Sequence, residues 1–163
     1  METKSPKMGL ATAAVLTALL LSTPDRAFGA DIPSLVHYSE IILFGKTVSV
    51  SCQWAQDAPC ILSHAKFRVE NSLRGNYRPG DVITIESQGG EINGMKQHVP
   101  NAASFQQGEY ALVFLNSESS GHLSVPYGME GVIPCYKNGK KVTTRSGKSL
   151  ERVMGEVTAA MGE

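Results

Sequence analysis

The feature that most constrains the fold of this chain is its series of short β-prone runs, which alternate with turns rich in Gly and Pro. These runs predict strands over residues 40–50, 61–73, 82–86, 109–115, 132–136 and 140–144. No helical pattern separates them, as a parallel α/β fold would require. A single helical period follows, over residues 149–161. This order predicts an all-β domain, a small barrel or sandwich with one C-terminal helix.

Glycines suggest where this series turns or bends. Asn138-Gly139 lies between two β-prone runs, which is the strongest short-range signal for a hairpin with a type I′ turn. Gly45 lies inside the first run and indicates a bend or bulge. The Gly89–Met95 segment is rich in glycine, which gives the backbone freedom at positive φ or permits the close approach of another chain, and we expect a wide β-turn. It lacks the pattern and the following helix of a phosphate-binding loop.

The first 29 residues have the parts of a secretory signal peptide. The start is basic, residues 9–22 carry no charge, and Ala27 and Gly29 are small enough for positions −3 and −1 of a cleavage site. The uncharged run is shorter than the roughly 18–20 residues that a membrane-spanning helix needs. We therefore expect cleavage after Gly29 rather than a membrane anchor. Residues 30–163 would then form a single exported domain, periplasmic or secreted, with no membrane span.

The charge balance argues against one class of partner. The full chain contains 15 Lys and Arg and 15 Asp and Glu, and removing the signal peptide leaves it close to neutral. Nucleic-acid binding needs a basic footprint that neutralises phosphates. Neither a long basic run nor an aromatic-plus-basic platform is visible, so we expect no nucleic-acid partner.

The three cysteines leave one thiol over if two of them pair. Cys52 and Cys60 flank a short polar loop and are the expected disulfide in the oxidising compartment that export implies. Such a bridge closes a small loop and would contribute on the order of 2–3 kcal/mol. Cys135 is then expected to be a buried thiol in a strand. Its alternatives are a nucleophile beside a histidine and a zinc site of all three cysteines, which lacks the close C-x-x-C pair of structural sites.

The remaining polar side chains give no recognisable catalytic or metal-binding pattern. The histidines are scattered and form neither an H-x-H nor an H-E-x-x-H motif. They are His37, His64, His98 and His122. The carboxylates and serines likewise form no acid–base pair or nucleophile elbow. No catalytic residue, metal ion or cofactor is therefore predicted.

The candidate binding residues lie on two loops. Trp54, the only tryptophan, falls inside the Cys52–Cys60 loop. It is either a binding anchor or folds back to cap the barrel, which the usual burial of tryptophan favours. Loops on a rigid barrel commonly carry binding, and the Gly89–Met95 loop is the second of them. The predicted binding residues are Trp54, Gly89, Gly90, Glu91 and Met95.

Three stretches of the chain carry a resemblance to a known family. They are Ser39–Val48, like a first core strand; Phe67–Gly75, like a strand ending in a lysine-glycine turn; and Phe105–Leu115, like a strand entering a Tyr-containing apolar run. Together they resemble the OB-like Greek-key barrel of tissue inhibitors of metalloproteinases and netrin-type modules, and exported bacterial domains of that type. Arg74 stands in the place of the lysine. The resemblance covers roughly half of residues 30–163 and implies a fold more than a function.

The chain departs from the inhibitors at the residues that carry their activity. Those proteins chelate a protease's zinc through a mature N-terminal cysteine. Here the mature chain would begin Ala30-Asp31, with no cysteine before Cys52. Inhibition by that route is not supported.

The predicted function is that of an exported, non-enzymatic binding module. It would engage an extracytoplasmic protein, including a protease, or a glycan of the envelope through the barrel loops. The alternatives are a structural protein of the cell envelope and an enzyme that depends on Cys135.

Overall fold

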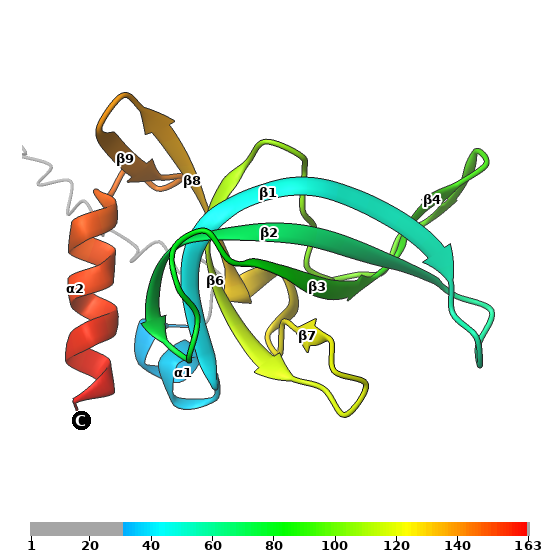
Figure 1. The fold of residues 1–163 in the computed structure, drawn as a ribbon, viewed down its shortest axis with the longest axis horizontal. Coiled ribbons are helices and arrows are strands. Elements are labelled where there is room, and N and C mark those ends of the chain that lie inside the picture. The colour runs from blue at the N-terminus through cyan, green and yellow to red at the C-terminus, as the bar shows by residue number, and fades with distance from the viewer. Residues whose placement is uncertain (1–30, 163) are drawn as a thin grey trace, which may run out of the picture.

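The structure is a computed structural model that describes residues 31–162 (Figure 1). The predicted signal peptide and its cleavage site lie outside the described residues. The elements in chain order are α1 (Ile32–His37), β1 (Ile41–Trp54), β2 (Ile61–Arg74), β3 (Val82–Gln88), β4 (Gly90–Ile92), β5 (Met95–Gln97), β6 (Tyr110–Ser117), β7 (Leu123–Ser124), the 3-10 helix η1 (Gly128–Gly131), β8 (Val132–Asn138), β9 (Lys141–Thr144) and α2 (Leu150–Met161).

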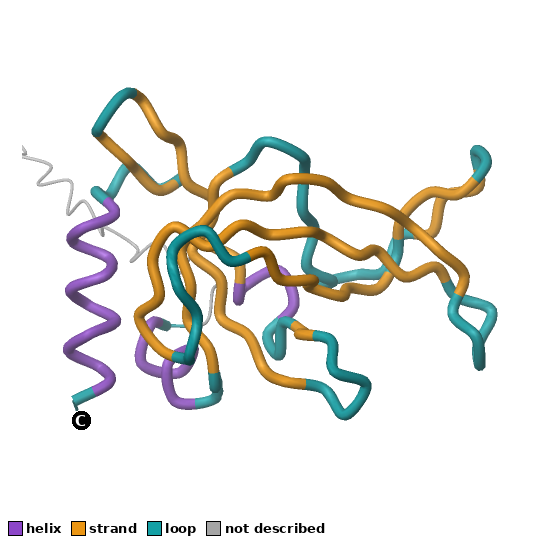
Figure 2. Tube along the Cα trace, in the orientation of Figure 1, coloured by secondary structure: helices purple, strands orange, loops and turns teal. Residues whose placement is uncertain are grey.

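Five strands close into a ring. β1 pairs with β2, β2 with β3, β3 with β7, β7 with β6, and β6 returns to β1. Every pair is antiparallel except β3 and β7. β8 and β9 extend the sheet from β6, and β4 and β5 form a separate two-stranded sheet. Strands dominate the trace in Figure 2. The structure confirms the predicted fold class at the level of a small, barrel-like all-β fold with one C-terminal helix.

The first five residues of β1 and the middle of β6 are buried on both faces, because two core clusters lie on either side of them. Leu43 and Val113 point into the barrel, where they pack with Phe67 of β2. Phe44 and Phe114 point the other way, into a second cluster that the two helices cover. A strand buried on both faces has a continuous apolar sequence rather than an alternating one, which explains the uninterrupted apolar runs of β1 and β6.

The two helices pack against each other at one end of the barrel (Figure 1). Asp31 caps α1 by accepting a hydrogen bond from the Ser34 N–H at 3.0 Å. Ser149 caps α2 in the same way, from the Arg152 N–H at 3.3 Å. The predicted helix 149–161 is confirmed, and it covers an end of the barrel. Within the described residues, no helix is both long and apolar enough to cross a membrane.

Three predicted turns differ in the structure. The type I′ turn predicted at Asn138-Gly139 lies one residue further on, because Asn138 ends β8 and pairs with Lys141. Of the two turn residues between them, only Gly139 has a positive φ angle, 59°. The strand expected to end at residue 50 continues to Trp54, so the loop at the end of β1 is shorter than predicted. The Gly89–Met95 segment is not a wide turn but the start of the β4–β5 hairpin, which turns at Asn93 and Gly94 with positive φ angles of 51° and 80°. The bend predicted at Gly45 is confirmed by a register shift between Phe44 and Gly45.

Candidate functional site

The predicted binding loops lie at the same end of the molecule, opposite α2. Figure 1 shows the β1–β2 tip and the β4–β5 hairpin projecting there. The two are joined at their bases. The Gly89 N–H donates to the Ile61 carbonyl oxygen at 2.7 Å, and the Ser63 hydroxyl donates to the Gly89 carbonyl oxygen at 2.6 Å. We call the part of the molecule formed by residues 52–62 and 89–97 the hairpin end.

Gly89 and Gly90 position the β4–β5 hairpin. Gly89 is buried, and a Cβ atom on it would lie 2.8 Å from the Gln97 carbonyl oxygen. A Cβ atom on Gly90 would lie 2.6 Å from Cys52 Sγ and 2.6 Å from Ser63 Oγ. Both residues have a positive φ angle, 92° and 138°, which side chains disfavour. These two predicted site residues therefore set the position of the hairpin and offer little surface of their own.

Trp54, Glu91 and Met95 supply the surface of the hairpin end. Trp54 is the last residue of β1 and is 47% exposed, and Met95 is 59% exposed. Side chains two residues apart on a strand share a face, so Trp54 lies on the same face of β1 as Cys52. Gly90 packs against this face, since a Cβ atom on it would lie 2.6 Å from Cys52 Sγ. Glu91 is exposed and pairs with Lys96 at 3.3 Å. The indole does not fold back into the core.

The predicted Cys52–Cys60 disulfide is not formed. All three cysteines are free, and all lie within the described residues. The physical reason is the register of the hairpin: Cys52 faces Ser63, with 3.4 Å between Sγ and Oγ, while Cys60 lies three positions before Ser63. Three positions span about 10 Å along a strand and reverse the face, whereas a disulfide needs Cα atoms about 4.4–6.8 Å apart.

Cys135 is a buried thiol in a strand, as its first interpretation predicts. It is 5% exposed in β8, within the core cluster that the helices cover. Its Sγ donates to the Ile133 carbonyl oxygen at 3.4 Å. Burial raises the pKa of the Cys135 thiol. The thiolate is the reactive form of cysteine, so this environment suppresses its reactivity.

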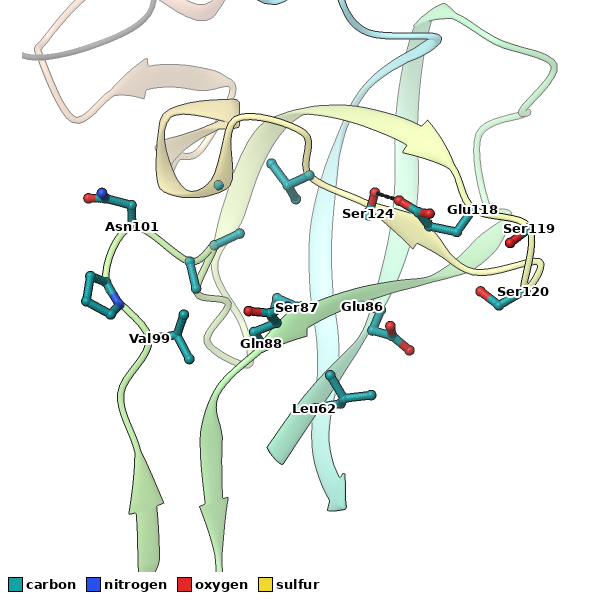
Figure 3. A pocket seen from close by; sticks show the side chains of 15 residues that line it. Leu62, Glu86, Ser87, Gln88, Val99, Asn101, Glu118, Ser119, Ser120 and Ser124 are labelled. Carbon is teal, nitrogen blue, oxygen red and sulfur yellow. Dashed lines mark hydrogen bonds between the residues drawn. The ribbon is translucent and has the colours of Figure 1, made fainter. Parts of the chain in front are cut away.

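A pocket of about 460 Å³ lies beside the end of β3 and next to β7. Its walls come from the end of β3, the segment before β6 and the β6–β7 loop. Glu86, Glu118, Ser119 and Ser120 are among the lining residues drawn in Figure 3. Glu118 accepts a hydrogen bond from the Ser124 hydroxyl.

Beside the pocket, the fold brings together three side chains that the sequence leaves far apart. His64 Nε2 lies 3.0 Å from Glu86 Oε2, and the rings of His64 and His122 meet edge to face with centroids 5.5 Å apart. We call His64, Glu86 and His122 the His–Glu–His cluster. One ligand atom from each lies within 4.8 Å of the others, and over residues 31–162 no other such group of three was found. Two of the four histidines that look scattered in the sequence are therefore neighbours.

By its fold, the chain belongs to the class of small barrel-like β proteins. It matches no model of a known protein family and no curated protein. Its function must therefore be inferred from the hairpin end, the pocket and the His–Glu–His cluster.

Proposed function

We propose that this protein is an exported, non-enzymatic binding module that holds an extracytoplasmic protein partner through its hairpin end. The observation that carries the proposal is the exposure of Trp54, the only tryptophan of the chain. Tryptophan is usually highly buried, and exposed tryptophans are enriched among the residues that dominate the affinity of protein interfaces. The export step rests on the signal-like N-terminal sequence alone.

The chemistry of the hairpin end suits a protein partner. Trp54 and Met95 supply apolar anchors, while Glu91 and Lys96 form an exposed ion pair that leaves the surface without a strong net charge. An apolar centre with a polar rim is typical of protein interfaces. A nucleic acid would require basic residues instead. Gly89 and Gly90 let the β4–β5 hairpin pack closely against the β1–β2 hairpin, so Trp54 and Met95 lie on two elements that support each other.

The cysteine-dependent enzyme is the weaker alternative. Cys135 is buried in the core behind the helices, and burial raises the pKa of its thiol. A nucleophilic cysteine needs a lowered pKa and access to a substrate. Both requirements run against this environment.

The first part of the test concerns export. The protein is expressed with its native N-terminus, recovered from outside the cytoplasm, and its N-terminal residue is determined. We expect Ala30. A chain that stays in the cytoplasm and begins at Met1 would overturn the exported part of the proposal.

The second part concerns the surface. Chemical cross-linking on intact cells, followed by purification, compares the wild type with Trp54→Ala and with a matched control, Tyr136→Ala. Tyr136 is also an exposed aromatic residue, at 59%, but lies on β8 away from the hairpin end. We expect a discrete cross-linked protein that Trp54→Ala loses and Tyr136→Ala keeps. Equal cross-linking by both variants would refute the role of the hairpin end.

A further inference from the structure

The His–Glu–His cluster is a consequence of how three neighbouring strands pair. His64 of β2 lies directly opposite Glu86 of β3, and Glu86 lies beside Ser124 of β7. Residues directly opposite in neighbouring strands point to the same face. His122 precedes Ser124 by two residues, at the entry to β7, so strand alternation directs it to that face as well. Two neighbouring strands of the ring and the residue just before a third thus each contribute one side chain to one spot.

The cluster lies on the outer face of the barrel and not in its core. Ala65 and Ile85, the neighbours of His64 and Glu86 along their strands, point into the barrel interior. The side chain of His64 is 12% exposed and that of Glu86 is 29% exposed. The site is thus shielded from bulk water but open on one side. Glu86 also lines the neighbouring pocket, which places the open side next to a cavity.

The three side chains supply a donor set that suits a transition metal. Imidazole nitrogen is a preferred ligand of Zn²⁺, Cu²⁺, Ni²⁺ and Fe²⁺, and two histidines with one carboxylate form a known type of zinc site that keeps a coordination position open. Hard ions such as Ca²⁺ and Mg²⁺ take oxygen ligands instead. The chemistry of the cluster therefore selects against the common hard cations.

The distances are compatible with such an ion after small side-chain rotations. With zinc–ligand distances of about 2.0–2.2 Å, tetrahedral ligand atoms lie roughly 3.4 Å apart. His64 and Glu86 are already at 3.0 Å, and the widest separation in the cluster is within 4.8 Å. Rotation of the His122 ring at the end of its loop would close the remaining gap.

We propose that His64, Glu86 and His122 bind one divalent transition-metal ion, with Zn²⁺ as the expected occupant. The ion keeps at least one coordination position open on the side of the pocket that Glu86 lines. A water molecule or a donor atom of a bound ligand completes its coordination. This site is separate from the hairpin end, so the two proposals stand or fall independently.

The test is a calorimetric titration of ZnCl₂ into the full chain, purified without a polyhistidine tag and freed of metal by a chelator. We expect saturable binding of one equivalent. Glu86→Gln keeps the size of the side chain and removes the anionic ligand, and His122→Ala removes a ligand near the surface. Each should weaken binding at least tenfold, because losing even an outer partner of a metal site costs roughly 10–100-fold.

Two matched controls separate the cluster from adventitious binding. His37→Ala and His98→Ala each remove an exposed histidine outside the cluster and should bind zinc as the wild type does. Cobalt in place of zinc reports the ligands by its visible spectrum, in which thiolate ligation adds a strong near-ultraviolet band. We expect no such band.

Three outcomes would overturn the proposal. They are the absence of saturable binding by the wild type, wild-type affinity in folded Glu86→Gln and His122→Ala, and a thiolate band that places the metal on cysteines. Circular dichroism of each variant confirms that it is folded. Since Glu86 lies on β3 and His122 in the loop before β7, a failure of one variant to fold leaves the other to decide.

Discussion

Replacing Gly45 by alanine should destabilise the protein by about 3 kcal/mol, because this glycine lets β1 approach β2 where the ring closes. Gly45 pairs with Val69 on one side and with Ala111 on the other. A Cβ atom at this position would overlap the Arg68 carbonyl oxygen and lie 2.7 Å from Phe67 Cε1. Neither neighbour can move freely, since one is backbone and the other is a fully buried ring.

The magnitude follows from the two effects of the added methyl group. Overpacking a well-packed core costs about 1–3 kcal/mol, and separating the strands enough to relieve the overlap weakens a ladder hydrogen bond worth about 1 kcal/mol. For a chain of this length, 3 kcal/mol corresponds to a fall in Tm of roughly 10 °C.

The same substitution in α2 provides the matched control. Gly155 is exposed, lies inside the helix, and has open space around the position of a Cβ atom. Gly155→Ala should therefore stabilise the protein by about 0.5–1 kcal/mol, since alanine has the higher helix propensity. Urea unfolding followed by circular dichroism gives the free energy of unfolding of both variants. If Gly45→Ala lies within about 0.5 kcal/mol of the wild type, or if both variants shift in the same direction, the close approach of β1 and β2 is refuted.

Four further predictions concern the indole, the accessibility of the buried thiol, the pH dependence that this thiol gives to stability, and the helix contact. Iodide should readily quench the fluorescence of Trp54, and emission shielded from iodide would place the indole in the core. Trp54→Ala should change the free energy of unfolding by no more than about 0.5 kcal/mol. Cys135 should react with a thiol reagent only on unfolding, after the other two cysteines, and equal rates would contradict its burial. The pKa of the Cys135 thiol is raised in the folded state, so its contribution to the free energy of unfolding is present below the ordinary cysteine pKa and is lost as the pH rises through the folded-state pKa. A free energy of unfolding that rises between these two pKa values in the wild type, but not in Cys135→Ala, would contradict this prediction. Val157→Ala, at a fully buried position of α2, should lower the free energy of unfolding by about 2 kcal/mol. The control Thr158→Ala, at an exposed position, should change it by no more than about 0.5 kcal/mol, and equal effects of the two variants would show that α2 does not pack as described.

The strands β1, β2, β3, β6, β8 and β9 and the helix α2 were predictable because their patterns are local. The β1 and β6 runs are apolar on both faces, and the period of α2 is regular, so each element is visible in its own residues. The β4–β5 hairpin was missed although Asn93-Gly94 carries the same turn signal as Asn138-Gly139. Its strands are three residues each and carry few β-branched residues, so no apolar run marked them.

The disulfide prediction failed for a related reason. Spacing along the chain shows that Cys52 and Cys60 are close in sequence, but it does not give the register of the hairpin between them. Because β1 continues to Trp54, Cys52 pairs with Ser63. Cys60 lies three residues before Ser63 and is therefore not opposite Cys52. A shift of a few residues in where a strand ends is enough to decide whether two cysteines can bond.

The His–Glu–His cluster illustrates the converse case, in which a site depends on pairing alone. Its members are separated by 22 residues between His64 and Glu86, and no motif of fixed spacing covers such a set. His64 and Glu86 meet because β2 and β3 form an antiparallel pair in one particular register, and His122 joins them only because β7 runs parallel to β3. That parallel pair comes from closing the ring, which is a property of the whole barrel. A shift of β3 by one residue would turn the Glu86 side chain into the barrel interior and separate it from the two histidines. The strand register of the barrel therefore decides whether the cluster exists.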